Sequence, residues 1–456
     1  MKLWDFLKSN MLLHKEQLVC ENNAQMTFED LVCWAELFAE RLKGLKCCAV
    51  LCGSEMAAGM ALLACFAAGV TTVPLSMRYG ELHCEKILNT ISPDAIITDD
   101  DGDFKIRRIP GSQYTVPDQH PALIMCTSGT TGTPKGAMLS ETNIITNVTD
   151  ISSYFGIVEM DTILISRPLY HCAVLSGEFL TALIKGVKIR FYSEQFNPSK
   201  MIELIQNFKV TAFCGTPTLL GMMSRFKKKS ERDTLRHICV SGECMEADLG
   251  LRIADAFPNC DIYHIYGLTE ASPRVSYLPP NLFRKYPDFV GIPLKSVSIK
   301  ILNKEGMLCR FGEEGILWIK GNNVMIGYYR DPANTEKVLK NGWLCTGDIA
   351  LMNNEGLLKI KGRNDHLIIK SGMNIYPAEV EAALRQSPLV KEVLIYGFKN
   401  RFGTQIGMKI AGNFSSVEEV KRLCVEFLPG FQVPALIEIV SELPKNGSGK
   451  IIRPGI

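Results

Sequence analysis

The sequence predicts an α/β protein with a large N-terminal domain of parallel α/β layers, a β-rich subdomain and a small mobile α+β C-terminal domain. From about residue 25 to 240, short β-branched runs such as TILIS and VKIRFY alternate with longer helical patterns. This alternation is typical of a largely parallel sheet covered by helices on both faces. Between about 285 and 361 the pattern changes to short strands such as VSIKIL, separated by turns that contain glycine. Beyond GRND, helical patterns at 377–386 and 417–427 indicate a compact final segment, so we expect domains at 1–363 and 364–456.

Length and composition indicate a globular protein of several units. The chain has 456 residues, of which 46% are hydrophobic and 21% charged, so it has ample material for a buried core. Its net charge is only +2, which provides no general field to attract nucleic acid or an anionic membrane. We therefore expect no nucleic-acid partner, and any bound anion must be held by local groups.

Cysteine and histidine usage argues against disulfides and a zinc site. The 16 cysteines lie scattered in apolar runs without a C-x-x-C pair, which indicates reduced, buried thiols in a cytoplasmic protein. The 7 histidines are widely spaced and give little support for zinc. The N-terminus MKLWDFLKSN lacks the apolar core and cleavage site of a signal peptide.

One segment imitates a membrane span, because Met56 to Leu75 contains 20 residues without a charge. Its interior indicates a different structure. Gly69 is suited to end a helix, the run at 70–73 is β-branched, and Pro74 is suited to end a strand. We therefore expect a buried helix followed by a buried strand, and no membrane span.

The segment CTSGTTGTPKGAMLS, at 126–140, is rich in glycine and hydroxyl groups and carries one lysine, Lys135. Because glycine permits close approach of the backbone, such a loop directs N–H groups and hydroxyls at one anion, most naturally phosphate. It is not a Walker loop, since Pro134 replaces the second glycine and Gly136 the magnesium-binding hydroxyl. A strand-like run precedes it and a capped helix start at Ser140 follows, as in the phosphate loops of α/β folds. The alternative is a flexible surface linker.

Three further motifs carry polar groups suited to a nucleotide. YGLTE, at 266–270, combines an aromatic face, a hydroxyl and a carboxylate that could stack on a base and hold magnesium, but a helix start with Thr269 as N-cap explains it equally well. In GWLCTGDIA, Asp348 follows a turn, where an exposed carboxylate could bind both hydroxyls of a ribose; Asp after Gly is also a common turn residue. Lys450 lies in a Gly/Ser loop, where a terminal lysine is usually solvated.

Together these motifs resemble the superfamily of AMP-forming adenylating enzymes, which includes acyl- and aryl-CoA ligases, nonribosomal peptide adenylation domains and luciferases. The phosphate loop, YGLTE, TGD, GRND and GSGK occur in the family's order, and the resemblance extends over nearly all 456 residues. It implies that a carboxylate attacks the α-phosphate of ATP bound with Mg2+, giving an acyl-adenylate and pyrophosphate. The thiol of CoA or of a carrier-protein phosphopantetheine then displaces AMP. Positioning and charge neutralisation dominate catalysis of such a substitution.

The resemblance assigns a nucleotide site by motif position. The loop from Thr127 to Lys135 would hold the β- and γ-phosphates, Glu270 would bind magnesium, and Thr269 would touch the α-phosphate. Tyr266 would pack on adenine. The remaining nucleotide-binding positions are Ser128, Gly129, Thr130, Thr131 and Gly132 in the loop, Gly242 and Glu243 at the other wall of adenine, Gly267 beside Tyr266, and Asp348 with Arg363 at the ribose.

The resemblance also implies a moving C-terminal domain. Lys450 would reach between the α-phosphate and the acyl carboxylate and stabilise charge in the first step. Asp365 resembles the hinge about which this domain turns between the steps. In the second pose Lys450 would leave, and the loop with Gly372 would line the pantetheine channel.

The acid substrate is less closely specified. His171, in PLYHCAVLSGEF, matches a position where related ligases place a histidine or aromatic gate, although a structural histidine explains it nearly as well. This region lacks the Asp that pairs with an α-ammonium group, so we expect an aryl or simple acyl acid. The candidate pocket residues are His171, Cys214, Gly215, Gly242 and Ser272.

The chain departs from the family pattern in its short C-terminal segment and in a missing Asp near KNRFGTQ, which concern the docking surface more than the chemistry. A free-standing ligase that loads an acyl or aryl carrier protein is an analogy only. Three alternatives stay open: an amino-acid-activating domain, a non-catalytic nucleotide-binding relative and an adenylate-using oxygenase like the luciferases. A non-catalytic role is disfavoured by the intact Lys135, Glu270, Asp348, Arg363 and Lys450. The sequence specifies no oligomeric state.

Overall fold

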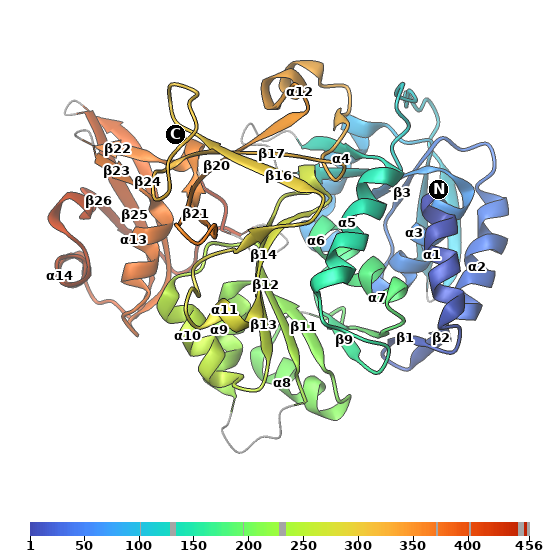
Figure 1. Cartoon of the computed structure of the whole chain (residues 1–456), viewed down its shortest axis with the longest axis horizontal. Helices are drawn as coiled ribbons and strands as arrows, with labels where there is room; N and C mark the ends of the chain where they lie inside the picture. Colours follow the sequence, from blue (N-terminus) through green and yellow to red (C-terminus); the bar gives the residue numbers. More distant parts are fainter. Residues whose placement is uncertain are drawn as a thin grey trace. The chain divides into compact units, whose positions relative to one another are not determined.

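The computed structural model describes residues 1–100, 102–127, 134–194, 196–227, 234–370, 373–400, 403–445 and 451–453 (Figure 1). It divides into two compact units. The first comprises residues 1–299 and 318–345, and the second comprises residues 300–317 and 346–456. This division by packing differs from the expected boundary near 364. A hinge at Asp365 concerns motion and stays a prediction.

The first unit contains two sheets, and the larger has nine strands. Along the chain these are β1 (Leu18–Glu21), β2 (Ala24–Thr27), β9 (Thr162–Ile165), β10 (Lys188–Phe191), β11 (Ala212–Gly215), β12 (His237–Ser241), β13 (Asp261–Gly267), β14 (Arg274–Leu278) and β15 (Ile292–Pro293). Their order in space is β15-β14-β13-β12-β11-β9-β10-β1-β2. The strands from β13 to β1 are parallel, and β2, β14 and β15 pair antiparallel at the two edges.

The second sheet of this unit has seven strands. They are β3 (Cys47–Val50), β4 (Thr71–Pro74), β5 (Ala95–Asp100), β6 (Asp103–Arg108), β7 (Leu123–Thr127), β8 (Lys135–Leu139) and β18 (Gly327–Tyr328). Their order is β18-β8-β7-β4-β3-β5-β6. The central strands β7, β4, β3 and β5 are parallel, and β6, β8 and β18 are antiparallel to their neighbours.

Helices cover these sheets. They are α1 (Leu3–Leu13), α2 (Phe28–Arg41), α3 (Glu55–Ala68), α4 (Glu81–Ile91), α5 (Glu141–Tyr154), α6 (Cys172–Val174), α7 (Thr181–Ile184), α8 (Pro198–Asn207), α9 (Pro217–Phe226), α10 (Ala247–Ala256), α11 (Pro280–Phe283) and α12 (Pro332–Val338). Short turns are η1 (Met77–Tyr79), the π-helical η2 (Leu175–Leu180) and the 3₁₀ turn η3 (Thr269–Ala271). Figure 1 shows α8, α9 and α10 beside β11 to β13, where α9 packs on β11 and β12.

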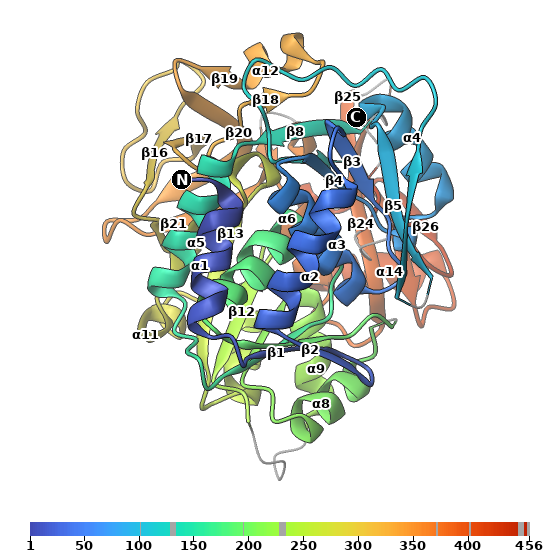
Figure 2. The ribbon, with the colours of Figure 1, turned by 90° about the vertical axis from the view of Figure 1, so that its right-hand side faces the viewer.

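The helix α3 explains the uncharged run that imitates a membrane span. It contacts β3 and β4 of the seven-stranded sheet, β1 of the nine-stranded sheet and the helices α1 and α2, and its residues 55–66 are all buried (Figure 2). A helix that is apolar on all faces must be buried in this way. Gly69 ends it with a left-handed φ of 66°, as expected. Within the described ranges, no helix is both long and apolar enough to cross a bilayer.

Two buried carboxylates close the N-terminal end of α3. Glu21 accepts a hydrogen bond from the N–H of Glu55 (3.3 Å), and the Glu55 carboxylate accepts one from the N–H of Leu169 (2.9 Å). Burial raises the pKa of Glu55 to about 7; the Leu169 hydrogen bond and Arg78 oppose this rise, and the charge of Glu21 adds to it. Because Leu169 lies two residues before His171, Glu55 holds the segment that carries the candidate pocket histidine.

The substitution Glu55→Gln should therefore stabilise the protein at neutral pH but not in acid. A carboxyl whose folded-state pKa is raised to about 7 stabilises the fold fully below its ordinary value of 4.5, and this contribution is lost as the pH rises toward 7. Glutamine keeps an acceptor for the N–H of Leu169 but carries no charge. Above about pH 7 the free energy of unfolding of the variant should therefore exceed that of the wild type by about 3 kcal/mol. Thermal unfolding between about pH 5 and pH 8 measures it. Glu16→Gln, at a side chain 82% exposed, is the control, and a pH-independent difference for E55Q would contradict the prediction.

A five-stranded sheet forms the β-rich region expected from the short strands. Its members are β16 (Val297–Leu302), β17 (Gly315–Gly321), β19 (Leu339–Lys340), β20 (Trp343–Met352) and β21 (Leu358–Arg363). The order is β16-β17-β20-β19, with β21 also pairing with β20.

The second unit ends in an α+β segment with its own core. Its elements are η4 (Asn364–His366), β22 (Ile368–Lys370), β23 (Met373–Ile375), α13 (Pro377–Leu384), β24 (Val390–Asn400), β25 (Gly403–Gly412), α14 (Val417–Phe427), η5 (Gly430–Gln432) and β26 (Leu436–Ile439). The sheet β24-β25-β26 packs its apolar side chains with those of α13 and α14. The two helices begin where the sequence predicted them.

Candidate active site

The carboxyl ends of parallel strands in the nine-stranded sheet gather the predicted adenine and acid positions. The strands β13, β12, β11 and β9 are consecutive in this sheet. Their carboxyl ends carry Cys214–Gly215 on β11, Gly242–Glu243 after β12 and Tyr266–Gly267 on β13, and β9 leads toward His171. Ligands of open α/β sheets bind outside the carboxyl ends of the strands. The first unit thus brings these predicted residues to one sheet edge.

Neighbouring strands place the two predicted adenine walls side by side. Ser241 pairs with Ile265, so Gly242 and Tyr266 are the next residues of the adjacent strands. The Glu243 carboxylate accepts hydrogen bonds from the N–H (3.2 Å) and the Oγ1 hydroxyl (2.6 Å) of Thr218, in the first turn of α9. Because the Glu243 side chain is engaged there, the backbone at this position is the part available to a base.

The YGLTE motif spans the end of β13, which includes Tyr266 and Gly267, and the start of the 3₁₀ turn η3. The turn η3 spans only Thr269–Ala271 and its N-cap is Leu268, so the alternative of a helix start capped by Thr269 is wrong. The backbone carbonyl of Glu270 accepts a hydrogen bond from the N–H of Met325 (2.9 Å), which ties the turn to the segment before β18.

One tyrosine, Tyr328, joins the predicted magnesium ligand to the predicted phosphate lysine. Its hydroxyl donates to Oε1 of Glu270 (2.8 Å), and the Lys135 Nζ lies 5.4 Å from the centroid of its ring. In the described ranges no cluster of three or more His, Cys, Asp or Glu side chains could hold a metal. Mg2+ is commonly held by one or two carboxylates together with substrate phosphates and water. The single carboxylate of Glu270 beside Lys135 therefore fits a magnesium ion that arrives with a nucleotide.

The strands β7 and β8, on either side of the predicted phosphate loop, pair as a β-hairpin. Thr127 at the end of β7 pairs with Lys135 at the start of β8, and the Thr127 hydroxyl donates to the Lys135 carbonyl (3.5 Å). A strand rather than a helix thus follows the loop, because β8 pairs with both β7 and β18. The expected helix start at Ser140 is confirmed, since its hydroxyl accepts from the N–H of Asn143 (3.1 Å). The predicted loop residues that lie outside the described ranges are Ser128, Gly129, Thr130, Thr131 and Gly132.

The predicted ribose pair is formed in the second unit. Asp348 on β20 lies directly opposite Arg363 on β21, and Arg363 Nη1 is 3.5 Å from Asp348 Oδ1 and 2.9 Å from the carbonyl of Thr346. Asp348 is only 8% exposed and lies inside a strand, so the expectation of an exposed carboxylate after a turn is wrong. The pairing of β20 with β21 and the Arg363 side chain shield the Asp348 carboxylate from solvent. Gly347 has a φ of 73°, and a Cβ there would lie 3.1 Å from Arg363 Nη2, so glycine lets the guanidinium approach.

The remaining pocket candidates have structural contacts of their own. His171 is the N-cap of α6, and its ring meets that of Tyr170 edge-on at 5.6 Å. Ser272 is fully buried and its hydroxyl donates to the carbonyl of Asn323 (2.8 Å). Cys214 is buried, and a Cβ on Gly215 would lie 3.1 Å from Leu220, so close packing by itself favours a small residue there. Roles for these residues in acid binding stay predictions.

Three residues predicted in the second unit cannot be placed as side chains. Lys450 and Gly372 lie outside the described ranges, and only the backbone of Asp365 is described, in η4. The residue after Lys450, Ile451, forms a β-bridge with Lys445.

A buried charged cluster near His171 escaped the sequence analysis. Glu178, in the π-helical η2, is 1% exposed and forms an ion pair with Arg167 at 2.6 Å. Arg274 is also buried, and its guanidinium donates hydrogen bonds to the Tyr154 hydroxyl (2.7 Å) and the Gly177 carbonyl (2.9 Å). Burial raises the pKa of Glu178, and the charge of Arg167 counteracts this in part. π-Helical turns occur frequently at functional sites. In the sequence, the glutamate within the apolar run AVLSGEFLTALI is the feature that could have revealed this cluster.

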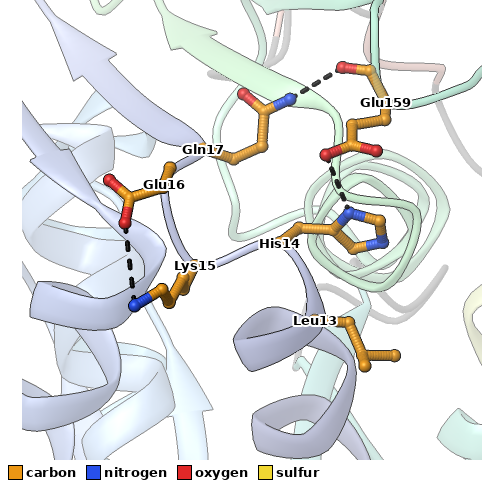
Figure 3. Close-up of a pocket in the computed structure, with 6 residues that line it drawn as sticks. All are labelled: Leu13, His14, Lys15, Glu16, Gln17 and Glu159. Carbon is orange, nitrogen blue, oxygen red and sulfur yellow. Dashed lines mark hydrogen bonds and ion pairs between the residues drawn. The ribbon is translucent and has the colours of Figure 1, made fainter.

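A surface hollow lies away from these motifs (Figure 3). It is lined by Leu13, His14, Lys15, Glu16, Gln17 and Glu159. The His14 ring lies 3.2 Å from the Glu159 carboxylate, and the Gln17 amide donates to the Glu159 carbonyl (2.7 Å). It contains none of the predicted site residues, and the contacts within it join the end of α1 to the loop before β9.

A hairpin flanking the predicted phosphate loop, a sheet edge that carries the predicted adenine positions and a carboxylate suited to magnesium are the features expected of a nucleotide-binding α/β protein. The AMP-binding enzyme family model matches residues 9–329, and the AMP-binding enzyme C-terminal domain model matches residues 379–450. The chain belongs to the AMP-binding enzyme family, the superfamily of AMP-forming adenylating enzymes. The resemblance drawn from its motifs is therefore confirmed.

Relatives and a solved structure extend over most or all of the chain. The 2-succinylbenzoate–CoA ligase of Bacillus velezensis is 31% identical over 97% of this chain and 96% of its own length. The long-chain-fatty-acid–CoA ligase of Haemophilus influenzae is 32% identical over 75% of this chain, which spans 63% of that protein. The O-succinylbenzoate coenzyme A synthetase of Bacillus subtilis, solved with ATP and a magnesium ion, superimposes with a TM-score of 0.84 and 26% identity over 98% of both chains. The predicted fold class is confirmed.

Proposed function

We propose that this protein is an ATP-dependent acid–thiol ligase that activates an aryl or simple acyl carboxylic acid and transfers it to CoA. The grouping of Lys135 and Glu270 around Tyr328, in a chain of the AMP-binding enzyme family, carries this proposal. A cation for phosphates and a carboxylate for magnesium are the groups that adenylation needs at one place. The solved relative that holds ATP and magnesium supports the same assignment.

In the first step, a carboxylate oxygen of the acid attacks the α-phosphorus of ATP and pyrophosphate leaves. Glu270 would hold magnesium, which neutralises phosphate charge when bound, while Lys135 and the loop that Thr127 begins would hold the β- and γ-phosphates. Tyr266 with the Gly242 backbone would bound adenine. Thr269 would contact the α-phosphate, and the Asp348–Arg363 pair would hold the ribose. Such positioning converts a collision of two anions into an oriented reaction within one complex.

In the second step, the thiol sulfur attacks the acyl carbon, AMP leaves, and the thiol proton is released to solvent. Lys450 would serve only the first step. We propose that the chain turns about Asp365 between the steps and that the Gly372 loop then lines the path of the thiol arm. A carrier-protein phosphopantetheine is the alternative acceptor, because it presents the same thiol.

The acid would lie at the edge where β9, β11 and β12 end, near His171 and Gly215. The relatives act on a succinylbenzoate and on long-chain fatty acids, which supports aryl and acyl classes over amino acids. Ten of the 16 cysteines are buried, which accords with reduced thiols in a cytoplasmic setting, and we propose that setting on this ground alone.

Acid-dependent ATP–pyrophosphate exchange across a panel of aryl, fatty and amino acids tests this function. We expect exchange with one or more aryl or acyl acids, followed by AMP release when CoA or a carrier protein is added. Exchange with amino acids alone would contradict the proposed acid class, and its absence with every acid would contradict the ligase function. Light emission or oxygen uptake would favour a luciferase-like reaction instead.

A further inference from the structure

Tyr328 lies at the junction of three segments that meet at the proposed phosphate and magnesium site. Its hydroxyl reaches Glu270 on η3 at 2.8 Å, and its ring faces the Lys135 ammonium on β8 at 5.4 Å from the centroid. No motif in the sequence identified this tyrosine, and it is only 8% exposed. A buried tyrosine with its hydroxyl on a carboxylate and a cation on its face uses both its polar and its aromatic parts.

The backbone around Tyr328 is held firmly on both sides. The strand β18 pairs with β8, with Tyr328 opposite Ala137. The N–H of Tyr328 donates to the Thr335 hydroxyl (2.9 Å), which anchors the strand to α12. The N–H of Met325 donates to the Glu270 carbonyl (2.9 Å). These contacts fix the tyrosine relative to both the phosphate hairpin and the YGLTE turn.

The position of this side chain has an electrostatic consequence. An ammonium and a carboxylate that are free to approach each other form an ion pair and neutralise each other. The Tyr328 ring gives the Lys135 ammonium a favourable place on its face, and its hydroxyl gives one oxygen of Glu270 a charge-assisted hydrogen bond. Tyr328 therefore gives each of the two charges a local partner other than the opposite charge.

We propose that Tyr328 is a positioning residue of the adenylation step. Its hydroxyl orients the Glu270 carboxylate toward magnesium, and its ring holds the Lys135 ammonium toward the ATP phosphates and keeps these opposite charges apart. The role rests on the proposed function, because magnesium and the phosphates of ATP are the groups that Glu270 and Lys135 serve. Partners that orient a metal ligand typically contribute 10- to 100-fold in affinity or activity, roughly.

Binding of α,β-methylene-ATP to the full chain, measured by calorimetry with Mg2+ and with EDTA, tests this role. Tyr328→Phe removes only the hydroxyl, so it should weaken binding about tenfold with Mg2+ and less than about twofold with EDTA. Tyr328→Leu also removes the ring under Lys135, so it should weaken binding in both conditions. In a Glu270→Gln background, Y328F should have no further effect, because the carboxylate that it orients is gone.

Tyr329→Phe is the matched control. Tyr329 follows in the same segment, but its hydroxyl accepts from the N–H of Thr115 (3.0 Å) and its ring stacks on Tyr114, away from Glu270. Y329F should therefore leave the Mg2+ dependence unchanged. Equal effects of Y328F with Mg2+ and with EDTA, or additivity of Y328F with E270Q, would overturn the role of Tyr328 alone. Failure of the wild-type chain to bind the analogue with Mg2+ would overturn the proposed function and this role with it.

Discussion

Lys450→Ala should lower acid-dependent ATP–pyrophosphate exchange by at least about a hundredfold, the loss expected when one positioned charge is removed from a transition state. The proposed role of this lysine is to offset negative charge between the α-phosphate and the attacking carboxylate. The second step proceeds without that charge, so thioester formation from a supplied acyl-adenylate should stay within about twofold of wild type. Both half-reactions are measured on the same preparation, by exchange and by AMP release.

Lys445→Ala is the matched control for this experiment. Lys445 belongs to the same terminal stretch, forms an ion pair with Glu392, and is 40% exposed at its side chain. Lys445 has no assigned role at the nucleotide, so the variant should retain both half-reactions, although Glu392, 16% exposed, loses its ion-pair partner. Near-normal exchange in K450A would reject the assigned role of Lys450, and equal loss of both half-reactions would show damage to the C-terminal segment instead.

Arg453→Met should destabilise the C-terminal segment of the second unit by roughly 3–5 kcal/mol, because it leaves a buried carboxylate without its main partner. Glu381 on α13 is 2% exposed, and both of its oxygens accept hydrogen bonds from Arg453, at 2.8 and 2.6 Å. Arg453 also donates to the Ile395 carbonyl on β24 (3.1 Å), so the pair ties the end of the chain to helix and sheet. Amide hydrogen exchange of peptides from β24 and α13 measures the loss as exchange faster by about a hundredfold or more.

The neighbouring Arg385 supplies the control. It approaches the same Glu381 carboxylate at 3.5 Å, but its side chain is 44% exposed. Arg385→Met should therefore lower the free energy of unfolding of the C-terminal segment by less than about 1 kcal/mol. The double variant Glu381→Gln/Arg453→Met should recover much of the loss, since no buried charge is left unpaired. Equal destabilisation by R385M and R453M would contradict a special contribution of the buried pair.

Local features were predictable because the residues that determine them are neighbours in the chain. Ser140 was expected to begin a helix, and its capping partner Asn143 is three residues away. Gly69 was expected to end a helix, and glycine alone takes a left-handed φ there without strain. The helix at 417–427 was likewise found with the predicted bounds. Caps and turns of this kind need no information from distant segments.

Asp348 shows why the site was predicted only in part. The family's motif order placed it with Arg363 at the ribose, and the structure brings these two residues opposite each other. Its exposure did not follow, because burial depends on a strand partner 15 residues away. Lys135 was similarly expected in a loop that leads directly into a helix. In the structure it begins the strand β8, which pairs with β18 from a distant part of the chain.

The sequence by itself determined the family, the ends of several helices and the identity of the phosphate, magnesium and ribose candidates, since these depend on motif order and on adjacent residues. Only the tertiary structure decided that the helix of the uncharged run, α3, contacts strands of two sheets and that Tyr328 meets Glu270, 58 residues earlier in the chain. The physical reason is that strand pairing and side-chain burial depend on the packing of the whole unit. No short segment contains that information.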